Sequence, residues 1–132
     1  MIPNSFFFSL KIAVPNNVQI LGATSQTVNL GGSLTLQCSG QGNPAPTLSW
    51  IFSSSTSDAT TVGTGTTYSI TNAQRTNGGT YVCRGTNSLG STDSQGVTVD
   101  VQCKSILEWI DLCKTSHLIL LVDASRIHCL IL

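Results

Sequence analysis

Charged residues are scarce in this chain. Lys, Arg, Asp and Glu make up 9% of its 132 residues, and six basic side chains balance six acidic ones to a formal net charge of zero. Proteins that hold nucleic acid or an anionic membrane through phosphate contacts need a concentrated basic surface. The composition therefore gives no basic surface that would attract nucleic acid or an anionic membrane.

Long apolar runs are also missing. The longest run at the C-terminal end, Leu118–Val122, is far shorter than the roughly 20 apolar residues of a membrane-spanning helix. A short apolar cluster at Phe6–Phe8 is preceded by no basic residue, is interrupted by Lys11 and is followed by Pro15. We therefore expect no transmembrane segment, and a leader that is a poor version of a secretory signal.

The residue types of catalysis and metal binding are poorly represented. The two histidines, His117 and His128, lie near the C-terminus, and no motif places a base beside any hydroxyl, as an active nucleophile requires. With Cys113 and Cys129 they supply zinc-ligand types, but Cys-x3-His followed by an adjacent His-Cys is not a common ligand spacing. We predict no catalytic residue, no metal site and no cofactor, and a protein that is not an enzyme.

Hydroxyl residues are abundant instead, and they accompany a regular apolar alternation. Ser and Thr account for 28 of the 85 residues from Val18 to Gln102, a composition that suits strands and turns. Apolar residues recur at every second position in five stretches: Leu34, Leu36 and Cys38; Leu48, Trp50 and Phe52; Tyr68 and Ile70; Tyr81 and Cys83; Val97, Val99 and Val101. Each set faces one core, because successive side chains of a strand point to opposite faces.

Turn residues separate these stretches, at 31–32, 40–46, 63–65, 77–79 and 87–90. Many short strands at regular spacing predict an all-β, antiparallel two-sheet sandwich. Residues 53–61 are so poor in apolar side chains that we expect an edge strand or a loop there.

Composition divides the chain into three zones. Residues 1–16 are a mixed leader, residues 17–102 are the predicted domain, and residues 103–132 form a tail with few hydroxyls. The tail holds Cys103, Cys113 and Cys129, and we expect it to contribute nothing to the fold.

Four motifs of the central zone resemble the immunoglobulin-like superfamily, and more narrowly its I-set. Residues 32–38 resemble the start of the family's strand B, and residues 42–50, with Pro44 and Pro46, resemble the approach to strand C. Residues 77–83 are similar to the strand F signature, and residues 87–90 to the hairpin that follows it. The order and spacing of these motifs imply an immunoglobulin-like sandwich of I-set type.

The resemblance also implies a disulfide and a core signature. Cys38 and Cys83 would form a bridge between the sheets, with Trp50 packed against it. Closing a loop of roughly 45 residues is worth about 4 kcal/mol in the chain-entropy model. Tyr81 would hydrogen-bond back to the backbone at the corner before its strand, and the other members of the signature are Leu36 and Ile70.

One position departs from the family pattern. Asn77 stands where the family usually has an acidic residue paired with a basic one, and residues 53–67 contain no Lys or Arg. Both halves of that ion pair are therefore absent together, which costs less than leaving one charge uncompensated. We expect Asn77 to make local turn hydrogen bonds instead.

A disulfide indicates an oxidising compartment, so the resemblance implies an extracellular or cell-surface location within a larger protein. The last four residues, Cys129–Leu132, match the prenylation pattern, but prenylation takes place in the cytosol. The two interpretations exclude each other for one molecule.

The function implied by the resemblance is non-catalytic protein binding in cell adhesion or receptor assembly, with partners that include immunoglobulin-like domains of the same or another chain. Recognition would use sheet faces, an exposed strand edge or the end loops, where the candidate binding residues are Asn43, Ala45, Asn87 and Leu89. Two alternatives stay open: a structural module of a titin-like intracellular filament, and an ectodomain fragment of a receptor enzyme.

Overall fold

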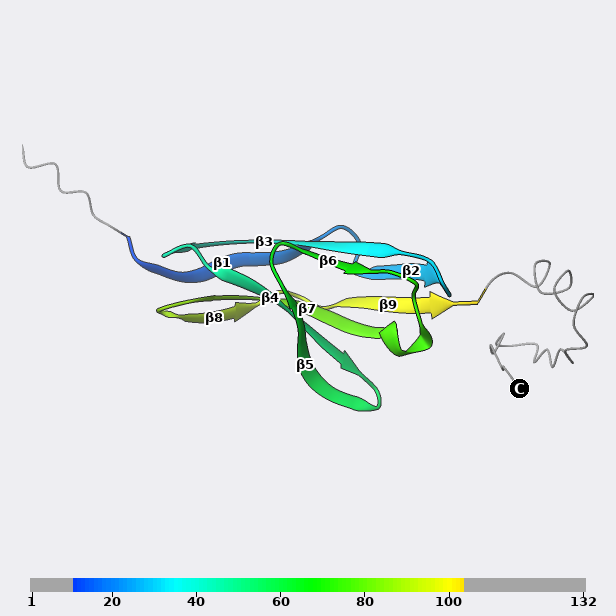
Figure 1. Ribbon diagram of the computed structural model, residues 1–132. Coiled ribbons are helices and arrows are strands. Elements are labelled where there is room, and N and C mark those ends of the chain that lie inside the picture. The colour runs from blue at the N-terminus through cyan, green and yellow to red at the C-terminus, as the bar shows by residue number, and fades with distance from the viewer. Residues whose placement is uncertain (1–10, 104–132) are drawn as a thin grey trace, which may run out of the picture.

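The computed structural model describes residues 11–103, which fold into two facing layers of β-strands (Figure 1). In chain order the elements are β1 (Ala13–Leu21), β2 (Ser25–Asn29), β3 (Leu34–Asn43), β4 (Thr47–Ser54), β5 (Ser57–Thr64), β6 (Thr67–Ile70), the 3-10 turn η1 (Arg75–Asn77), β7 (Gly79–Asn87), β8 (Gly90–Asp93) and β9 (Val97–Gln102). The predicted all-β sandwich is confirmed.

The smaller sheet has the order β1-β3-β6 and the larger one β2-β9-β7-β4-β5, with β8 paired to β7. All pairs are antiparallel except β2 with β9. The chain passes from one sheet to the other between β1 and β2, where Gly22 takes a φ of +107° that a side chain would disfavour. The described chain enters at one end of the sandwich and leaves at the other (Figure 1).

Strand β1 begins inside the stretch predicted as leader. Ala13 lies opposite Asn43 and Asn16 lies opposite Gln41 in the pairing of β1 with β3. The same pairing extends β3 to Asn43, so the predicted turn over 40–46 is shorter than expected. The added positions hold Asn16, Gln41 and Asn43 among Pro and Gly, so no regular apolar alternation marked them in the sequence.

Residues 53–61, predicted as an edge strand or a loop, form a hairpin at the edge of the larger sheet. Strand β4 continues to Ser54, and β5 resumes at Ser57 as the outermost strand. Every residue of β5 except Gly63 is exposed. The exposure explains the missing apolar residues, because an edge strand turned to solvent has no core to fill.

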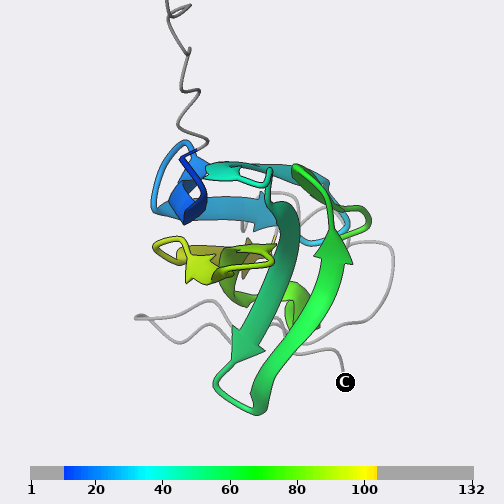
Figure 2. The same ribbon diagram turned by 90° about the vertical axis from the view of Figure 1, so that its left-hand side faces the viewer.

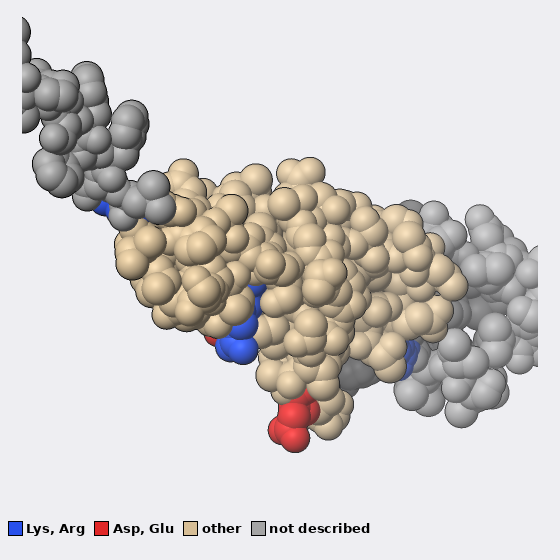
Figure 3. Space-filling view, turned by 60° about the vertical axis from the view of Figure 1, so that its left-hand side comes forward, with Lys and Arg blue, Asp and Glu red and all other residues tan. Residues whose placement is uncertain are grey.

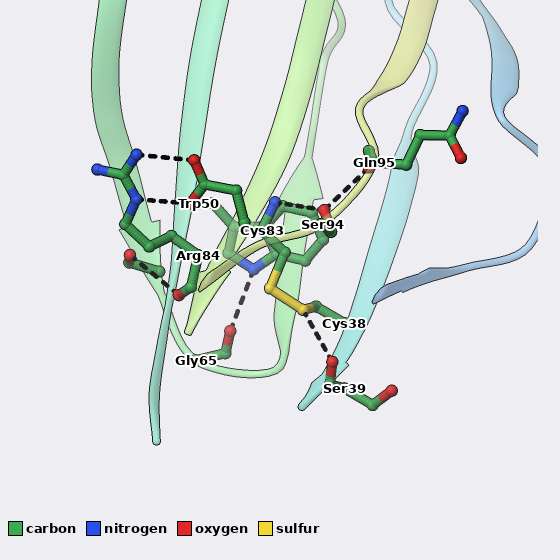
Figure 4. Close-up of a disulfide and its surroundings, with 10 residues drawn as sticks. Cys38, Ser39, Trp50, Gly65, Cys83, Arg84, Ser94 and Gln95 are labelled. Atoms are coloured by element: carbon green, nitrogen blue, oxygen red, sulfur yellow. Dashed lines mark hydrogen bonds and ion pairs between the residues drawn. A yellow bond between two sulfur atoms is a disulfide. The ribbon is translucent and has the colours of Figure 1, made fainter. Parts of the chain in front are cut away.

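The core lies between the sheets, around Trp50 and the disulfide. Cys38 of β3 and Cys83 of β7 are bonded, with their Cα atoms 6.3 Å apart. Trp50 lies beside the bridge, and its Nε1 donates to the Gly65 carbonyl at 3.1 Å (Figure 4). Trp50, Tyr81 and Cys83 are at most 1% exposed, and Leu36 and Ile70 are 3% exposed.

Four aromatic rings join the two sheets beside the disulfide. The ring centroid of Tyr68 lies 6.1 Å from that of Trp50 and 5.5 Å from that of Tyr81. Phe52 approaches Tyr81 at 4.8 Å. These tilted pairs fall within the favourable range for aromatic contacts, so they add packing energy beyond the area that they bury.

Tyr81 and Asn77 hold the corner that leads into β7. The Tyr81 hydroxyl donates to the Asn77 carbonyl at 2.9 Å, and Asn77 Oδ1 accepts the Gln74 N–H at 2.7 Å. The amide of Asn77 thus makes a local turn bond in the place of an ion pair. Burial raises the pKa of Tyr81 to about 12; the neighbouring Tyr68 adds to this rise, and the hydrogen bond with Asn77 opposes it.

Removing the disulfide is expected to lower the free energy of unfolding by about 4 kcal/mol, because the bridge restricts the unfolded chain over a separation of 45 residues. The double variant C38A/C83A tests this in urea unfolding followed by tryptophan fluorescence. A loss below about 1 kcal/mol would contradict the contribution assigned to the bridge.

Stability is expected to fall as the pH rises from about 10 to about 12. The unfolded chain releases the Tyr81 proton near pH 10, whereas the folded chain keeps it to about pH 12. The folded state therefore binds more protons across this window, and rising pH favours unfolding, while below pH 10 the contribution is fully present. Melting temperatures of wild type and Y81F should show a flatter pH dependence for Y81F; equal slopes would exclude Tyr81 as the group responsible.

Candidate functional site

Two loops and the first strand meet at one end of the sandwich, the end that faces the viewer in Figure 2. The turn between β3 and β4 comes beside the start of β1, because Ala13 pairs with Asn43. The hairpin between β7 and β8, residues 87–90, lies against both, as the contacts of Asn87 show. The structure thus brings the four candidate binding residues, Asn43, Ala45, Asn87 and Leu89, to one end.

Asn87 ties the three segments together. Its Nδ2 donates to the Ala13 carbonyl at 2.8 Å and to the Pro44 carbonyl at 3.0 Å. Its Oδ1 accepts the Leu89 N–H at 2.9 Å, closing the hairpin. Both amide protons are used inside the domain, so Asn87 positions the loops, and we call its three hydrogen bonds the clamp.

Neutral side chains donate hydrogen bonds to the carbonyls of Lys11, Ala13 and Pro15, at the start of β1. Asn43 Nδ2 donates to the Lys11 carbonyl at 3.1 Å, and Asn87 Nδ2 donates to the Ala13 carbonyl. Thr92 Oγ1 donates to the Pro15 carbonyl at 2.5 Å. The donors come from β3, β7 and β8, that is, from both sheets. This end of β1 is therefore fixed to both layers of the sandwich.

Apolar side chains remain exposed on this fixed backbone. We call Ile12, Val14, Pro44, Ala45 and Leu89 the apolar tip. Ile12 is 65% exposed, Val14 52% and Leu89 43%, and both loop residues are exposed as well. Since the hydrogen bonds above hold its backbone, little conformational entropy remains to be lost when a partner covers it.

Charged side chains are few on the face drawn in Figure 3. Residues 11–103 contain three basic and three acidic side chains, and Arg84 and Asp93 pair across β7 and β8. Arg84 Nε and one of its Nη atoms donate to the two carboxylate oxygens at 2.6 and 2.8 Å. The hydrogen bonds from Arg84 lower the pKa of Asp93. No sequence motif predicted this pair, because it depends on the register of β8 against β7.

Within residues 11–103 no three His, Cys, Asp or Glu side chains cluster as a metal site would require. No helix in this part of the chain is long and apolar enough to span a membrane. The zinc-ligand types at residues 113–129, the prenylation match at Cys129 and the apolar leader at Phe6–Phe8 lie outside the described residues.

A family model described as an immunoglobulin domain matches residues 16–87, more than half of the chain. The chain belongs to the immunoglobulin domain family. The matched range includes both bridged cysteines, Trp50 and Asn87 of the clamp. The I-set subtype stays a prediction.

Three relatives show similar identity to this immunoglobulin domain. It is 34% identical over 98 residues to Zwei Ig domain protein zig-1 of Caenorhabditis elegans, covering 68% of this chain and 37% of that protein. It is 33% identical over 99 residues to human MAM domain-containing glycosylphosphatidylinositol anchor protein 2, covering 74% and 10%. It is 32% identical over 100 residues to peroxidasin homolog pxn-1 of Caenorhabditis elegans, covering 68% and 7%.

The immunoglobulin domain thus corresponds to between 7% and 37% of the length of these relatives. Among solved structures, the tandem Ig repeats of Dlar match with a TM-score of 0.57 at 22% identity, covering 73% of this chain and 50% of that one. At this identity the likeness shows the shared fold.

Replacing Asn87 with Ala is expected to lower the free energy of unfolding by about 1–3 kcal/mol, because two carbonyls and one N–H lose their partner. Urea unfolding measures the loss, with S88A as the matched control, since the neighbouring Ser88 is exposed and belongs to the same hairpin. Equal stability of N87A and S88A would contradict the stabilising role assigned to the Asn87 hydrogen bonds.

Proposed function

We propose that this immunoglobulin domain is a non-catalytic recognition module of a larger extracellular or cell-surface protein, and that it binds other proteins through the apolar tip. The observation that carries the proposal is the exposure of Ile12, Val14 and Leu89 on a backbone that Asn87 holds in place. Clustered apolar side chains on a soluble surface mark sites of protein interaction.

The low charge of the domain favours a protein partner that is itself apolar at the contact. Lys11 precedes Ile12 of the tip in the sequence, and the charges of Arg84 and Asp93 are already paired with each other. An apolar patch on another immunoglobulin-like domain, of the same or another chain, matches this chemistry. Affinity would then come from burying Leu89 and its neighbours, and salt would have little effect.

Two observations support a location outside the cytosol. The Cys38–Cys83 bridge requires an oxidising compartment to form and persist. One relative carries a glycosylphosphatidylinositol anchor in its name, and such anchors attach proteins to the cell surface. The bridge speaks against the intracellular filament alternative, whereas an ectodomain fragment of a receptor enzyme remains compatible with the same recognition role.

Leu89→Asp is expected to reduce binding to a protein partner at least about tenfold, because it places a charge in the contact that must lose water. The probe is the full chain, biotinylated and tetramerised on streptavidin, applied to intact cells with and without surface proteolysis. Leu21→Asp is the matched control: Leu21 is 48% exposed, close to the 43% of Leu89, but lies at the far end of β1.

Loss of protease-sensitive binding with L89D and its retention with L21D supports the tip as the binding site. Equal binding by L89D and wild type would overturn that assignment. Binding that persists after surface proteolysis would contradict the proposal that the partner is a protein.

A further inference from the structure

The strand edges of the sandwich are protected to different degrees. β1 contains Pro15, which lacks an N–H. Three side chains donate hydrogen bonds to the carbonyls of Lys11, Ala13 and Pro15. β2, β6 and β8 are only four or five residues long. β5 has eight residues without Pro, Lys or Arg, and no described strand pairs with its outer side. Natural proteins usually blunt such an edge.

The exposed side chains of β5 suit another strand. Thr60, Thr61, Val62 and Thr64 are β-branched, a residue class that favours paired strands. Asp58 is the one charge on the strand and stands near its beginning. The β4–β5 hairpin also projects from the body of the sandwich, so a neighbouring molecule can reach its edge (Figures 1 and 2).

We propose that β5 pairs with β5 of a second copy of this chain, antiparallel and about a two-fold axis at Thr61. The two larger sheets then join into one continuous sheet across the dimer. Since a two-fold contact uses the same surface on both copies, it closes at two chains and does not grow into a fibre.

The charge pattern of β5 favours a second copy as the occupant. In this register Thr60 of one copy faces Val62 of the other, and Asp58 lies outside the straight stretch. The two Asp58 side chains lie on opposite sides of the two-fold axis, each three residues from Thr61 in the chain. No like charges oppose each other, and no cation on β5 selects an acidic partner strand.

The pairing of β5 with β4 indicates where on β5 the contact between two copies would be centred. Pairing is irregular between Trp50 and Ile51 and again between Phe52 and Ser54. Between these irregularities Ile51 pairs with Thr61 and Phe52 with Thr60. Irregularities of this kind bend a strand, so only the stretch around Thr60 and Thr61 offers a straight edge. We therefore expect a short ladder and an association that depends on protein concentration.

Sedimentation velocity of the full chain over a wide range of concentrations tests the proposal. Wild type should shift from monomer to dimer, and Thr61→Lys should weaken the dimer at least about tenfold, because two lysines would then oppose each other at the axis. Thr27→Lys is the matched control, since Thr27 is an exposed threonine on the edge strand β2 of the same sheet. Circular dichroism melting checks that each variant is folded.

A mixture of T61K and T61E should recover the dimer, because opposite charges would then meet at the axis. A wild-type chain that stays monomeric at every concentration would overturn the proposal, as would a T27K effect equal to that of T61K or a mixture that fails to dimerise. Sedimentation of the L89D variant distinguishes the β5 contact from the apolar tip. If L89D abolishes the dimer and T61K does not, the dimer forms through the tip and the β5 contact is wrong.

Discussion

Both sheets depend on the packing of Trp50 against the Cys38–Cys83 bridge. The bridge joins β3 to β7, and the indole fills the space beside it and hydrogen-bonds to Gly65, where the chain passes from β5 to β6. One cluster therefore links the two layers and the crossing between them. Because a domain of this size has a net stability of only about 5–15 kcal/mol, a bridge worth about 4 kcal/mol is a large share of it.

The surfaces assigned to recognition are positioned from this core. Strand β7 carries Cys83 in its middle and Asn87 at its end, so the strand that the bridge holds also carries the clamp of the apolar tip. Strand β4 carries Trp50 and pairs with the exposed β5. Both surfaces carry little charge, so the proposed contacts would depend on apolar burial at the tip and on backbone pairing at the edge.

The sequence predicted the parts of the fold that alternate in polarity. Leu36, Trp50 and Tyr81 lie in such stretches, and their strands appear where the alternation placed them. The first strands were missed because Asn and Gln interrupt the pattern of β1, although Val18 and Val28 enter the core. The loop motifs named two segments that meet at the tip, and their role in binding stays a prediction. The role of Asn87 as a clamp was not predictable, because its partners lie 74 and 43 positions away.

The oxidised core can be tested through the redox state of Cys38 and Cys83 in protein isolated from its source cells with thiols blocked at lysis. Peptide mapping by mass spectrometry without reduction should find the two cysteines in one linked peptide pair. That result agrees with an oxidised core in an extracellular or cell-surface module. Recovery of both cysteines as alkylated thiols would contradict it and favour an intracellular module with a reduced core.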